Sequence, residues 1–557
     1  MTRARTTVAP GGQTNEPATA PRQQQGGGSL ARATGSMAIA TLVSRITGFL
    51  WKIMLAAAAG LTTVNDSFTV ANTLPNIVFE LLIGGVLASV VVPLLVRAQD
   101  DPDGGAAYTQ RLLTVGMTLL AVGTVIAVAL APLFTRLYMD GSTGTANPAL
   151  ATAFAYLLLP EILFYGLFAL LSAILNAKHI FGPTAWAPVM NNLVVMITIG
   201  VYWVVPGEIS TNPVRMGDAK LLVLGIGVTL GIVVQSLMLI PALRRSGFKF
   251  RWNWGFDERL KEFGGLGLWI LGYVAISQIG LIISTRVLTA GAAGGASIYS
   301  NAWLLFQLPY GVIGVSLLTA IMPRLSRAAA DGNHRKLIGD LSYASRLSAV
   351  ILVPISAILT VTGTSIGIVL FSWGRGSIAE ATRLGDALAV SAFGLLPYAL
   401  VMLQLRVFYA MKDARTPTLI MVVMTAVKIP LLYMCEALLS SEHVVIGVLM
   451  VNSLSYVVGA VLGQVWLWVR LGHLRTRRVV GVTLFSVFAG ALGVGAGLGV
   501  AKVLGGVLPD SNAVRAFLSL IIEGLVAGVV SFGVLTALRV EELKPATAKI
   551  TRLIRRR

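Results

Sequence analysis

The stretch MAIATLVSRITGFLWKIMLAAAAG, residues 37–60, is long and apolar enough to cross a membrane, yet it carries Arg45 and Lys52. Thr41, Arg45, Gly48 and Lys52 follow one another at spacings of 4, 3 and 4 residues, which places all four on one face of a helix. Ionisable side chains at membrane depth cost several kcal/mol unless they face a bundle interior or a water-filled cavity. We therefore predict a spanning helix whose polar face lines a functional site.

The next apolar segment, residues 68–96, also has a polar face. It is entered through Asn65-Asp66-Ser67, and Leu74-Pro75 interrupts the helical run, which predicts a kink. Glu80 could pair with Arg45 or Lys52, either as a structural bridge or as a gate that an arriving anion opens. The polar positions of this segment recur at helical spacing, and Asn76 among them is a candidate to line a cavity: Thr69, Thr73, Asn76, Glu80 and Gly84.

The composition indicates a polytopic membrane protein. Of the 557 residues, 55% are hydrophobic and only 12% are charged, against about 25% charged in soluble domains. The net charge of +19 would also fit a nucleic-acid partner. However, the basic residues cluster between apolar segments, where the positive-inside rule expects them, so we expect no nucleic acid.

The residue inventory argues against an enzyme. The single cysteine, Cys435, excludes an internal disulfide, and the four histidines have no metal-ligand spacing. No G-x-x-x-x-G-K-[ST] phosphate loop is present in the sequence, so nothing in it predicts nucleotide hydrolysis. We expect no catalytic residue, no metal and no cofactor, although a coupling ion or the membrane potential could drive a transporter.

Fourteen apolar segments are long enough to span a bilayer, which takes about 20 residues. With the N-terminus inside, the turns rich in Lys and Arg all fall on the inner side, so both termini are expected in the cytoplasm of a multi-pass bacterial inner (plasma) membrane protein. Residues 1–36, rich in Gly, Gln and Pro, predict a disordered cytoplasmic tail. The segments are residues 37–60, 68–96, 112–135, 150–176, 184–205, 221–243, 264–289, 298–323, 346–370, 387–408, 418–438, 444–469, 479–502 and 514–538.

The chain repeats itself at an offset of 234 residues. Lys178-His-Ile-Phe-Gly-Pro183-Thr184 matches Lys412-Asp-Ala-Arg-Thr-Pro417-Thr418, and Leu74-Pro75 matches Leu308-Pro309. Six spans lie within one offset, so the halves have the same orientation and the substrate site is expected between them. We predict six-helix lobes at 37–244 and 264–475, an amphipathic connector at 245–263, two further helices at 476–540 and a basic cytoplasmic tail at 541–557.

The repeat pairs Lys52 with Arg286, which predicts two cations facing each other across the cleft, one from each lobe. The alternative is that each cation snorkels to the outer headgroups. Lys428 lies in the middle of the eleventh segment, where it could replace a bound cation or line the cleft. Four other charges lie near segment ends, where we expect solvation: Glu161, Arg406, Glu436 and Glu523.

Several motifs resemble the MviN/MurJ family of lipid II flippases, within the multidrug/oligosaccharidyl-lipid/polysaccharide (MOP) exporter superfamily, including its actinobacterial members. The resemblance covers residues 37 to about 540. It implies two six-helix lobes around a cationic cavity, and two C-terminal helices that form a groove for a polyprenyl tail. The motifs are Ser44-Arg45-Ile-Thr-Gly48-Phe49, Asn65-Asp66-Ser-Phe68, Leu74-Pro75-Asn76, Ala173-Ile-Leu-Asn176, Ser277-Gln278-Ile279, Gly332-Asn333-His334 and Phe408-Tyr409-Ala410-Met-Lys-Asp413-Ala-Arg-Thr416-Pro417.

By position, the resemblance makes Arg45 a substrate-binding cavity arginine and Asp66 the acid that opens the second helix. Two other arginines of the family are absent, since Phe79-Glu80 and Leu304 stand in their places. We expect Arg286 and Lys428 to compensate, with Gln278 as a further cavity candidate.

The function expected is transport of undecaprenyl-pyrophosphate-linked peptidoglycan precursor, lipid II, from the inner to the outer leaflet by alternating access. Arg45, Lys52 and Arg286 would bind the pyrophosphate, because burying a diphosphate without cations is prohibitive. The expected partners are lipid II, membrane lipids, and a cytoplasmic pseudokinase-like extension or cell-wall regulatory proteins. The alternatives are a flippase for another polyprenyl-linked glycan, a drug or cation antiporter of the same superfamily, and a non-transporting cell-wall scaffold.

Overall fold

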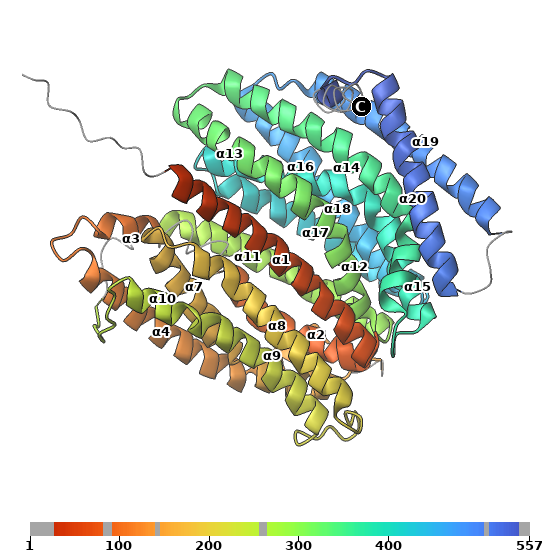
Figure 1. The fold of residues 1–557 in the computed structure, drawn as a ribbon. Helices are drawn as coiled ribbons and strands as arrows, with labels where there is room; N and C mark the ends of the chain where they lie inside the picture. The colour runs from red at the N-terminus through yellow and green to blue at the C-terminus, as the bar shows by residue number, and fades with distance from the viewer. Residues whose placement is uncertain (1–26, 82–91, 140–144, 256–263, 506–511, 545–557) are drawn as a thin grey trace, which may run out of the picture.

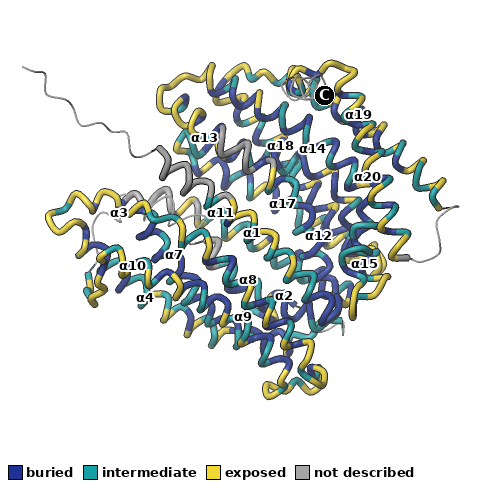
Figure 2. The backbone as a smooth tube through the Cα atoms, in the orientation of Figure 1, coloured by how far each residue is buried: buried dark blue, intermediate teal, exposed yellow. Residues whose placement is uncertain are grey.

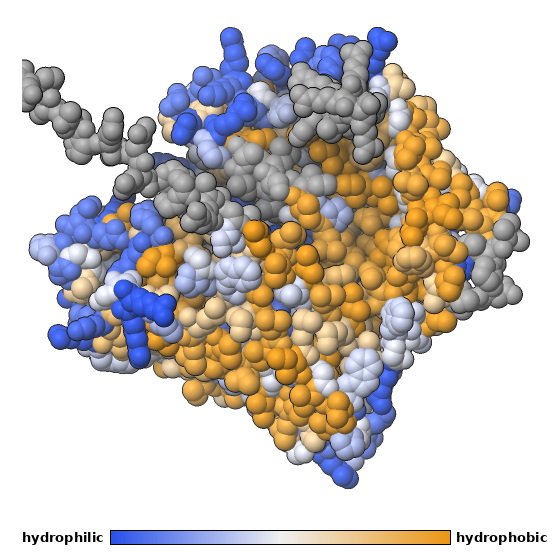
Figure 3. All heavy atoms as spheres, viewed as in Figure 1, coloured by the Kyte–Doolittle hydropathy of each residue, from blue (hydrophilic) through white to orange (hydrophobic). Residues whose placement is uncertain are grey.

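The computed structural model describes residues 27–81, 92–139, 145–255, 264–505 and 512–544, and these residues are helical apart from turns, loops and one isolated β-bridge between Thr211 and Val214. The helices form two groups that lie side by side, with α1 running diagonally between them (Figure 1). The visible surface is apolar across a broad belt, and hydrophilic residues gather at its two ends (Figure 3). The predicted all-α polytopic membrane fold is confirmed.

The first group, called the N-lobe, contains ten helices within the described residues. The first helix begins at Gly27, so the end of the predicted disordered tail is helical, while residues 1–26 lie outside the described part. The bounds are α1 Gly27–Ala59, α2 Thr63–Leu81, α3 Val92–Ala98, α4 Ala106–Ala129, α5 Ala131–Tyr138, α6 Pro148–Leu158, α7 Glu161–Ala177, α8 Gly182–Val204, α9 Ala219–Leu237 and α10 Leu239–Arg245.

The second group, called the C-lobe, is followed by two long helices, α19 and α20, which pack on each other and on α14. A π-helix, Tyr310–Gly314, separates α12 from α13, and a 3₁₀ turn, Ala392–Gly394, separates α15 from α16. The bounds are α11 Gly264–Gly291, α12 Gly295–Pro309, α13 Val315–Ala330, α14 His334–Phe371, α15 Ile378–Ser391, α16 Leu395–Ala410, α17 Arg415–Leu438, α18 Val444–Leu471, α19 Thr476–Leu504 and α20 Asn512–Ala537.

Eleven of the described helices are long and apolar enough to span a membrane, and the pair α6–α7, bent by 41°, makes up to twelve. The predicted segment 68–96 includes residues 82–91, which are not described. The predicted segment 298–323 is divided by the π-helix, because α12 and α13 do not continue one α-helical run. The number of fourteen spans therefore stays a prediction.

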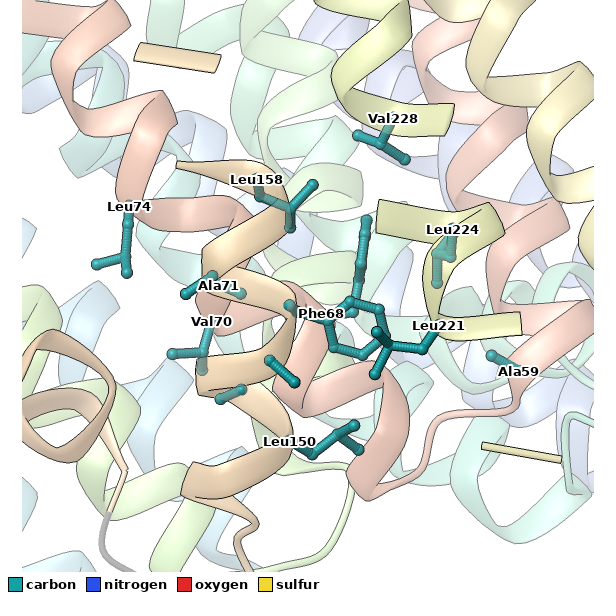
Figure 4. Packing of buried hydrophobic residues seen from close by; sticks show 14 of the residues in the cluster. Ala59, Phe68, Val70, Ala71, Leu74, Leu150, Leu158, Leu221, Leu224 and Val228 are labelled. Atoms are coloured by element: carbon teal, nitrogen blue, oxygen red, sulfur yellow. The ribbon is translucent and has the colours of Figure 1, made fainter. Parts of the chain in front are cut away.

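The two lobes have separate hydrophobic cores that meet at the end of α1. In the N-lobe core, Phe68 of α2 packs edge-to-face on Phe154 of α6 with ring centroids 5.6 Å apart (Figure 4). Ala58 and Ala59 belong to this core, whereas Ala56, two residues earlier, belongs to the C-lobe core. The run of small residues lets both lobes approach α1 closely, so its end contributes to both cores.

The repeat is visible in the backbone. After α7, His179 adopts φ 60°, and after α16, Lys412 adopts φ 59°. Each turn is closed by the same backbone hydrogen bond, from Ile180 N to Leu175 O at 2.8 Å and from Asp413 N to Phe408 O at 2.9 Å. The two lobes thus share a turn that the sequence marks with related motifs.

The loops between long helices fall on two faces, and exposed residues concentrate there (Figure 2). We call the face that carries the start of α1 the basic face, because its loops hold most of the cations. The connector of the sequence analysis begins here. Its described part, 246–255, has no helix and runs along α4, where Asn253 N donates to Thr114 Oγ1 at 3.0 Å. The loops of the opposite, far face are 60–62, 145–147, 205–218, 292–294, 372–377 and 439–443.

At the basic face, Asp413 fastens the turn between α16 and α17. It accepts hydrogen bonds from the backbone and hydroxyl groups of Thr416, at 3.0 and 2.6 Å, and pairs with Arg470 of α18. Burial alone would raise the pKa of Asp413, but the Thr416 hydrogen bonds and the Arg470 charge together hold that pKa below its usual value. The ionised form is therefore favoured by the folded state.

We expect Asp413→Asn to lower the melting temperature of the detergent-solubilised protein at neutral pH. A depressed pKa contributes stability above the unfolded-state pKa of about 3.9, and this contribution is lost as the pH falls through the folded-state pKa. The melting-temperature difference from wild type should therefore shrink under acid. Asp331→Asn, at the exposed end of α13, is the control; a difference for Asp413→Asn that does not change with pH would contradict the assignment.

Candidate functional site

The two lobes meet at the far face, where α1 ends and α2 begins. Asp66 of α2 is 1% exposed, and its Oδ1 accepts a hydrogen bond from the backbone N of Ser297 at 2.7 Å. Ser297 lies in the first turn of α12, so a carboxylate of the N-lobe caps a helix of the C-lobe. The predicted gating residue therefore lies in the contact between the lobes.

Backbone groups make the same contact close. Arg375 N, in the loop after α14, donates to Ala57 O of α1 at 2.8 Å, and Thr145 Oγ1 donates to Thr289 O at 2.7 Å. Gly294 has φ +79°, and a Cβ there would overlap the carbonyl oxygen of Leu61. The lobes thus pack so tightly at the far face that only glycine fits at this position.

A cavity of about 430 Å³ lies between the lobes, with walls from α1, α2, α11 and α12. Most of its lining side chains are amides, hydroxyls or aromatic rings, and Lys52 is the one charged residue among them. The lining residues are Lys52, Thr69, Val70, Asn72, Thr73, Asn76, Ile77, Gln278, Leu281, Thr285, Leu288, Ala296, Tyr299, Ser300, Trp303 and Gln307.

The polar groups of the cavity are held in defined positions. Asn76 donates to Asn72 O at 2.6 Å and accepts from the Tyr165 hydroxyl at 3.0 Å. Lys52 Nζ lies 4.6 Å from the centre of the Trp51 ring, a cation–π contact that does not neutralise its charge. Gln278 Oε1 is buried with no hydrogen-bond partner within the described residues, so this oxygen is available to a ligand donor.

Three of the residues singled out in the sequence line this one cavity: Lys52, Asn76 and Gln278. They come from α1, α2 and α11, that is, from both lobes. Their roles in binding stay predictions, since the structure carries no ligand. The alternative for Lys52, snorkelling to the headgroups, does not fit its place in the cavity wall.

The other predicted cations do not line this cavity. Arg45 is exposed, and its guanidinium lies against Gly311 in the π-helix of the C-lobe. Lys428 Nζ donates to Asn452 Oδ1 at 3.1 Å, between α17 and α18. Arg286 is half-buried on α11 next to Thr285, which does line the cavity. The expected facing pair of Lys52 and Arg286 is thus not seen across this cavity. The side chain of Glu80 lies outside the described residues.

Several lining residues were not singled out in the sequence, although the repeat offset points to two of them. Thr69 and Thr73 of α2 plus 234 give Trp303 and Gln307 of α12, and all four line the cavity. Equivalent helices of the two lobes therefore form facing walls. Trp303 also stacks on Phe306 and Tyr456 of the C-lobe, which fixes the orientation of its ring.

The expectation that four peripheral charges are solvated is half wrong. Arg406 and Glu436 are exposed, but Glu161 is 0% and Glu523 is 5% exposed. Glu161 lies at the break between α6 and α7, about 20 Å along the helix axis from Pro148 at 1.5 Å per residue. Counting residues from the nearest apolar end missed this, because the two helices together form one bent span.

Within the described residues, no three His, Cys, Asp or Glu side chains are grouped so as to hold a metal ion. The cavity thus offers one ammonium group, amides and hydroxyls, and an aromatic platform. This set can bind a polar, anionic ligand by hydrogen bonds and charge.

The structure is similar to solved MOP transporters. A structure titled "Lipid II flippase MurJ, inward closed conformation" matches with a TM-score of 0.71 and 18% identity over 90% of this chain and 99% of that chain. An inward-facing multidrug resistance MATE transporter of the MOP superfamily matches with a TM-score of 0.62 and 16% identity over 80% of this chain and 99% of that chain. At these identities the likeness shows the fold.

The sequence comparisons reach the family. The probable lipid II flippase MurJ of Rhizobium meliloti is 28% identical over 72% of this chain and 75% of its own length. That of Vibrio cholerae is 26% identical over 91% of this chain and 96% of its own length. The family model described as lipid II flippase MurJ matches residues 55–507, which include both lobes and the cavity between them. The chain belongs to the MurJ family of lipid II flippases.

Proposed function

We propose that the chain carries the headgroup of lipid II through the cavity between its lobes by alternating access, while the polyprenyl tail stays in the lipid. The observation that carries this proposal is a polar cavity with one cation, Lys52, beneath a far face where the lobes are in contact. Polar groups buried at membrane depth are costly unless they are partnered. A polar ligand gives Lys52 and Gln278 the partners that the cavity walls do not.

The composition of the walls suits this headgroup. A pyrophosphate needs charge-assisted hydrogen bonds, and Lys52 is the lining residue that supplies them. Sugars need amides and hydroxyls with an aromatic face, which Asn76, Gln307 and Trp303 provide. Arg45, exposed on the same helix toward the basic face, is placed to meet the pyrophosphate before Lys52 does.

The orientation follows from charge. We place the basic face in the cytoplasm of the inner membrane, because Lys and Arg concentrate in cytoplasmic loops. The headgroup then enters from the basic face and leaves when the far-face contact opens. A membrane potential, worth about 2.3 kcal/mol per charge per 100 mV, would help to return the empty cationic cavity to the cytoplasmic side.

The polyprenyl tail needs an apolar surface beside the cavity. α19 and α20 expose a row of large apolar side chains, and we propose that the tail lies along them. A pseudokinase-like extension or a cell-wall regulatory protein as partner stays an expectation from the resemblance. The exposed apolar residues of α19 include Leu484, Phe485, Val487 and Phe488.

We expect Lys52→Gln to abolish exposure of lipid II on the outer leaflet in cells depleted of their own flippase, and Lys52→Arg to restore it in part. The reason is that only the arginine keeps a positive charge in the cavity. The assay is the accessibility of lipid II to an added enzyme, at matched expression levels.

Lys412→Gln, which removes an exposed charge on the basic face, is the matched control and should behave as wild type. Arg286→Gln tests the predicted pair: if Arg286 faces the same anion, the double variant with Lys52→Arg is worse than either single change. Full activity of Lys52→Gln would rule out the proposed cavity chemistry.

A second prediction concerns closure of the far face. Gly294→Ala should keep the lobes apart there, because the added Cβ overlaps Leu61 O. In a Cys435→Ser background, a cysteine at the cavity residue Ser300 should then react with an impermeant thiol reagent added from the far side, and transport should slow.

Gly332→Ala is the control, because Gly332 has a similar φ of +63° with nothing within 4 Å of the added Cβ. It carries the same backbone strain without the overlap. Equal labelling of Ser300→Cys in both backgrounds would show that the Gly294 contact does not hold the far face closed.

A further inference from the structure

Glu161 is a buried carboxyl group that the mechanism above does not use. It lies in the first turn of α7, directly after Leu159-Pro160, where α6 and α7 bend by 41°. Its Oε1 is 3.2 Å from Thr229 Oγ1 of α9, and its Oε2 has no hydrogen-bond partner within the described residues. A carboxylate in this position would be incompletely compensated.

The Thr229 hydroxyl has two acceptors and one proton. It lies 2.8 Å from Leu157 O, the carbonyl at the end of α6, and 3.2 Å from Glu161 Oε1. If Glu161 is ionised, the two oxygens compete for that proton. If Glu161 is protonated, its own O–H donates to Thr229 Oγ1 while Thr229 donates to Leu157 O, and every group in the chain is satisfied. Protonation of Glu161 therefore decides whether Leu157 O keeps a full hydrogen bond at the bend.

The C-lobe has the same clamp without the acid. There Ser453 Oγ of α18 donates to Ser391 O, at the end of α15, at 2.9 Å. Ser391 lies 234 residues after Leu157, so both lobes hold the carbonyl at a helix break by a hydroxyl from their last helix. In the C-lobe the break continues through Gly394, whose added Cβ would overlap Ser453 Oγ. The clamp is thus structural in both lobes, and the carboxyl group is an addition in the N-lobe.

A hydrogen-bonded side chain leads from Glu161 toward the cavity. Tyr165 is one helical turn after Glu161, close enough for their charges to interact, and its hydroxyl donates to Asn76 Oδ1 at 3.0 Å. Asn76 lines the cavity. Water in the cavity thus reaches within two side chains of the buried acid.

No other described charge faces Glu161. On the helices packed against α7, Asp66 bonds Ser297, Arg111 lies beside Gly255, and Lys220 lies 5.0 Å from the Tyr202 ring. Arg97, Arg244 and Arg245 lie at the basic-face ends of α3 and α10. The side chain of Glu80 on α2 is not described. Tyr165 is therefore the titratable group with which Glu161 interacts.

We propose that Glu161 is a proton-binding site, loaded from the cavity past Tyr165 and Asn76, which couples a proton to the bend between α6 and α7. On loading, the carboxylate takes a proton from cavity water and forms an O–H bond, and Thr229 turns its own O–H fully to Leu157 O. On release, the proton returns to water. The inference rests on the proposed transport function, since it supplies a coupling ion for that cycle.

The test uses the full chain in two measurements. Infrared spectra of the purified protein should show the carbonyl stretch of a buried protonated carboxyl group that is lost in Glu161→Gln and shifted in Thr229→Val. In proteoliposomes at zero membrane potential, an imposed pH gradient should change the rate of lipid II movement in wild type and Thr229→Ser, but not in Glu161→Gln or Thr229→Val. Ser453→Ala, which breaks the clamp of the C-lobe, should keep the response to the pH gradient.

Glutamine keeps the volume of Glu161 and can donate to Thr229, so Glu161→Gln is expected to fold. A carboxyl band that persists in Glu161→Gln would overturn the proposal, and so would a full pH-gradient response in this variant. If wild type moves no lipid II, the proposed function fails, whereas the infrared comparison still decides whether Glu161 holds a proton.

Discussion

The hydrogen bond from Ser297 N to Asp66 is the contact on which the cavity depends. The first backbone N–H groups of a helix lack partners within it, and a capping side chain is worth about 0.5–2 kcal/mol. Here the cap comes from the other lobe, at 2.7 Å. α2, which supplies Asp66, and α12, which receives the bond, also form facing walls of the cavity. One contact thus closes the far face and fixes the distance between the walls.

The electrostatics of the cavity differ from the expected cluster of cations. Lys52 is the charged residue of its lining, and the rest of the polarity comes from amides and hydroxyls. Arg45 lies against the π-helix of the opposite lobe, so its charge is available outside this cavity. A single buried cation within a wall of neutral donors and acceptors costs less desolvation than three would, and it leaves room for the donors and acceptors of sugars.

Periodicity and hydropathy were sufficient to predict the all-α membrane fold, the polar faces of α1 and α2, and the parallel repeat. They also selected Lys52, Asn76 and Gln278, because each lies on the polar face of a spanning helix. They did not place Arg286 or Lys428, since a spacing identifies a face of a helix but not the neighbour that this face meets. Lys428 meets Asn452 within the C-lobe. Glu161 was misplaced because the bend after Leu159 is set by packing and by Pro160. The walls at Trp303 and Gln307 were predictable by extending the repeat to Thr69 and Thr73.

The central claim is that the far-face contact opens and closes during transport. It is tested most directly by the distance between spin labels on the two lobes, at the exposed far-face positions Pro206→Cys and Ala379→Cys in a Cys435→Ser background. We expect a short distance that matches the closed contact, a longer one that gains population when lipid II is added, and a further shift toward the longer distance with Asp66→Asn. A single short distance that neither lipid II nor Asp66→Asn changes would contradict the claim.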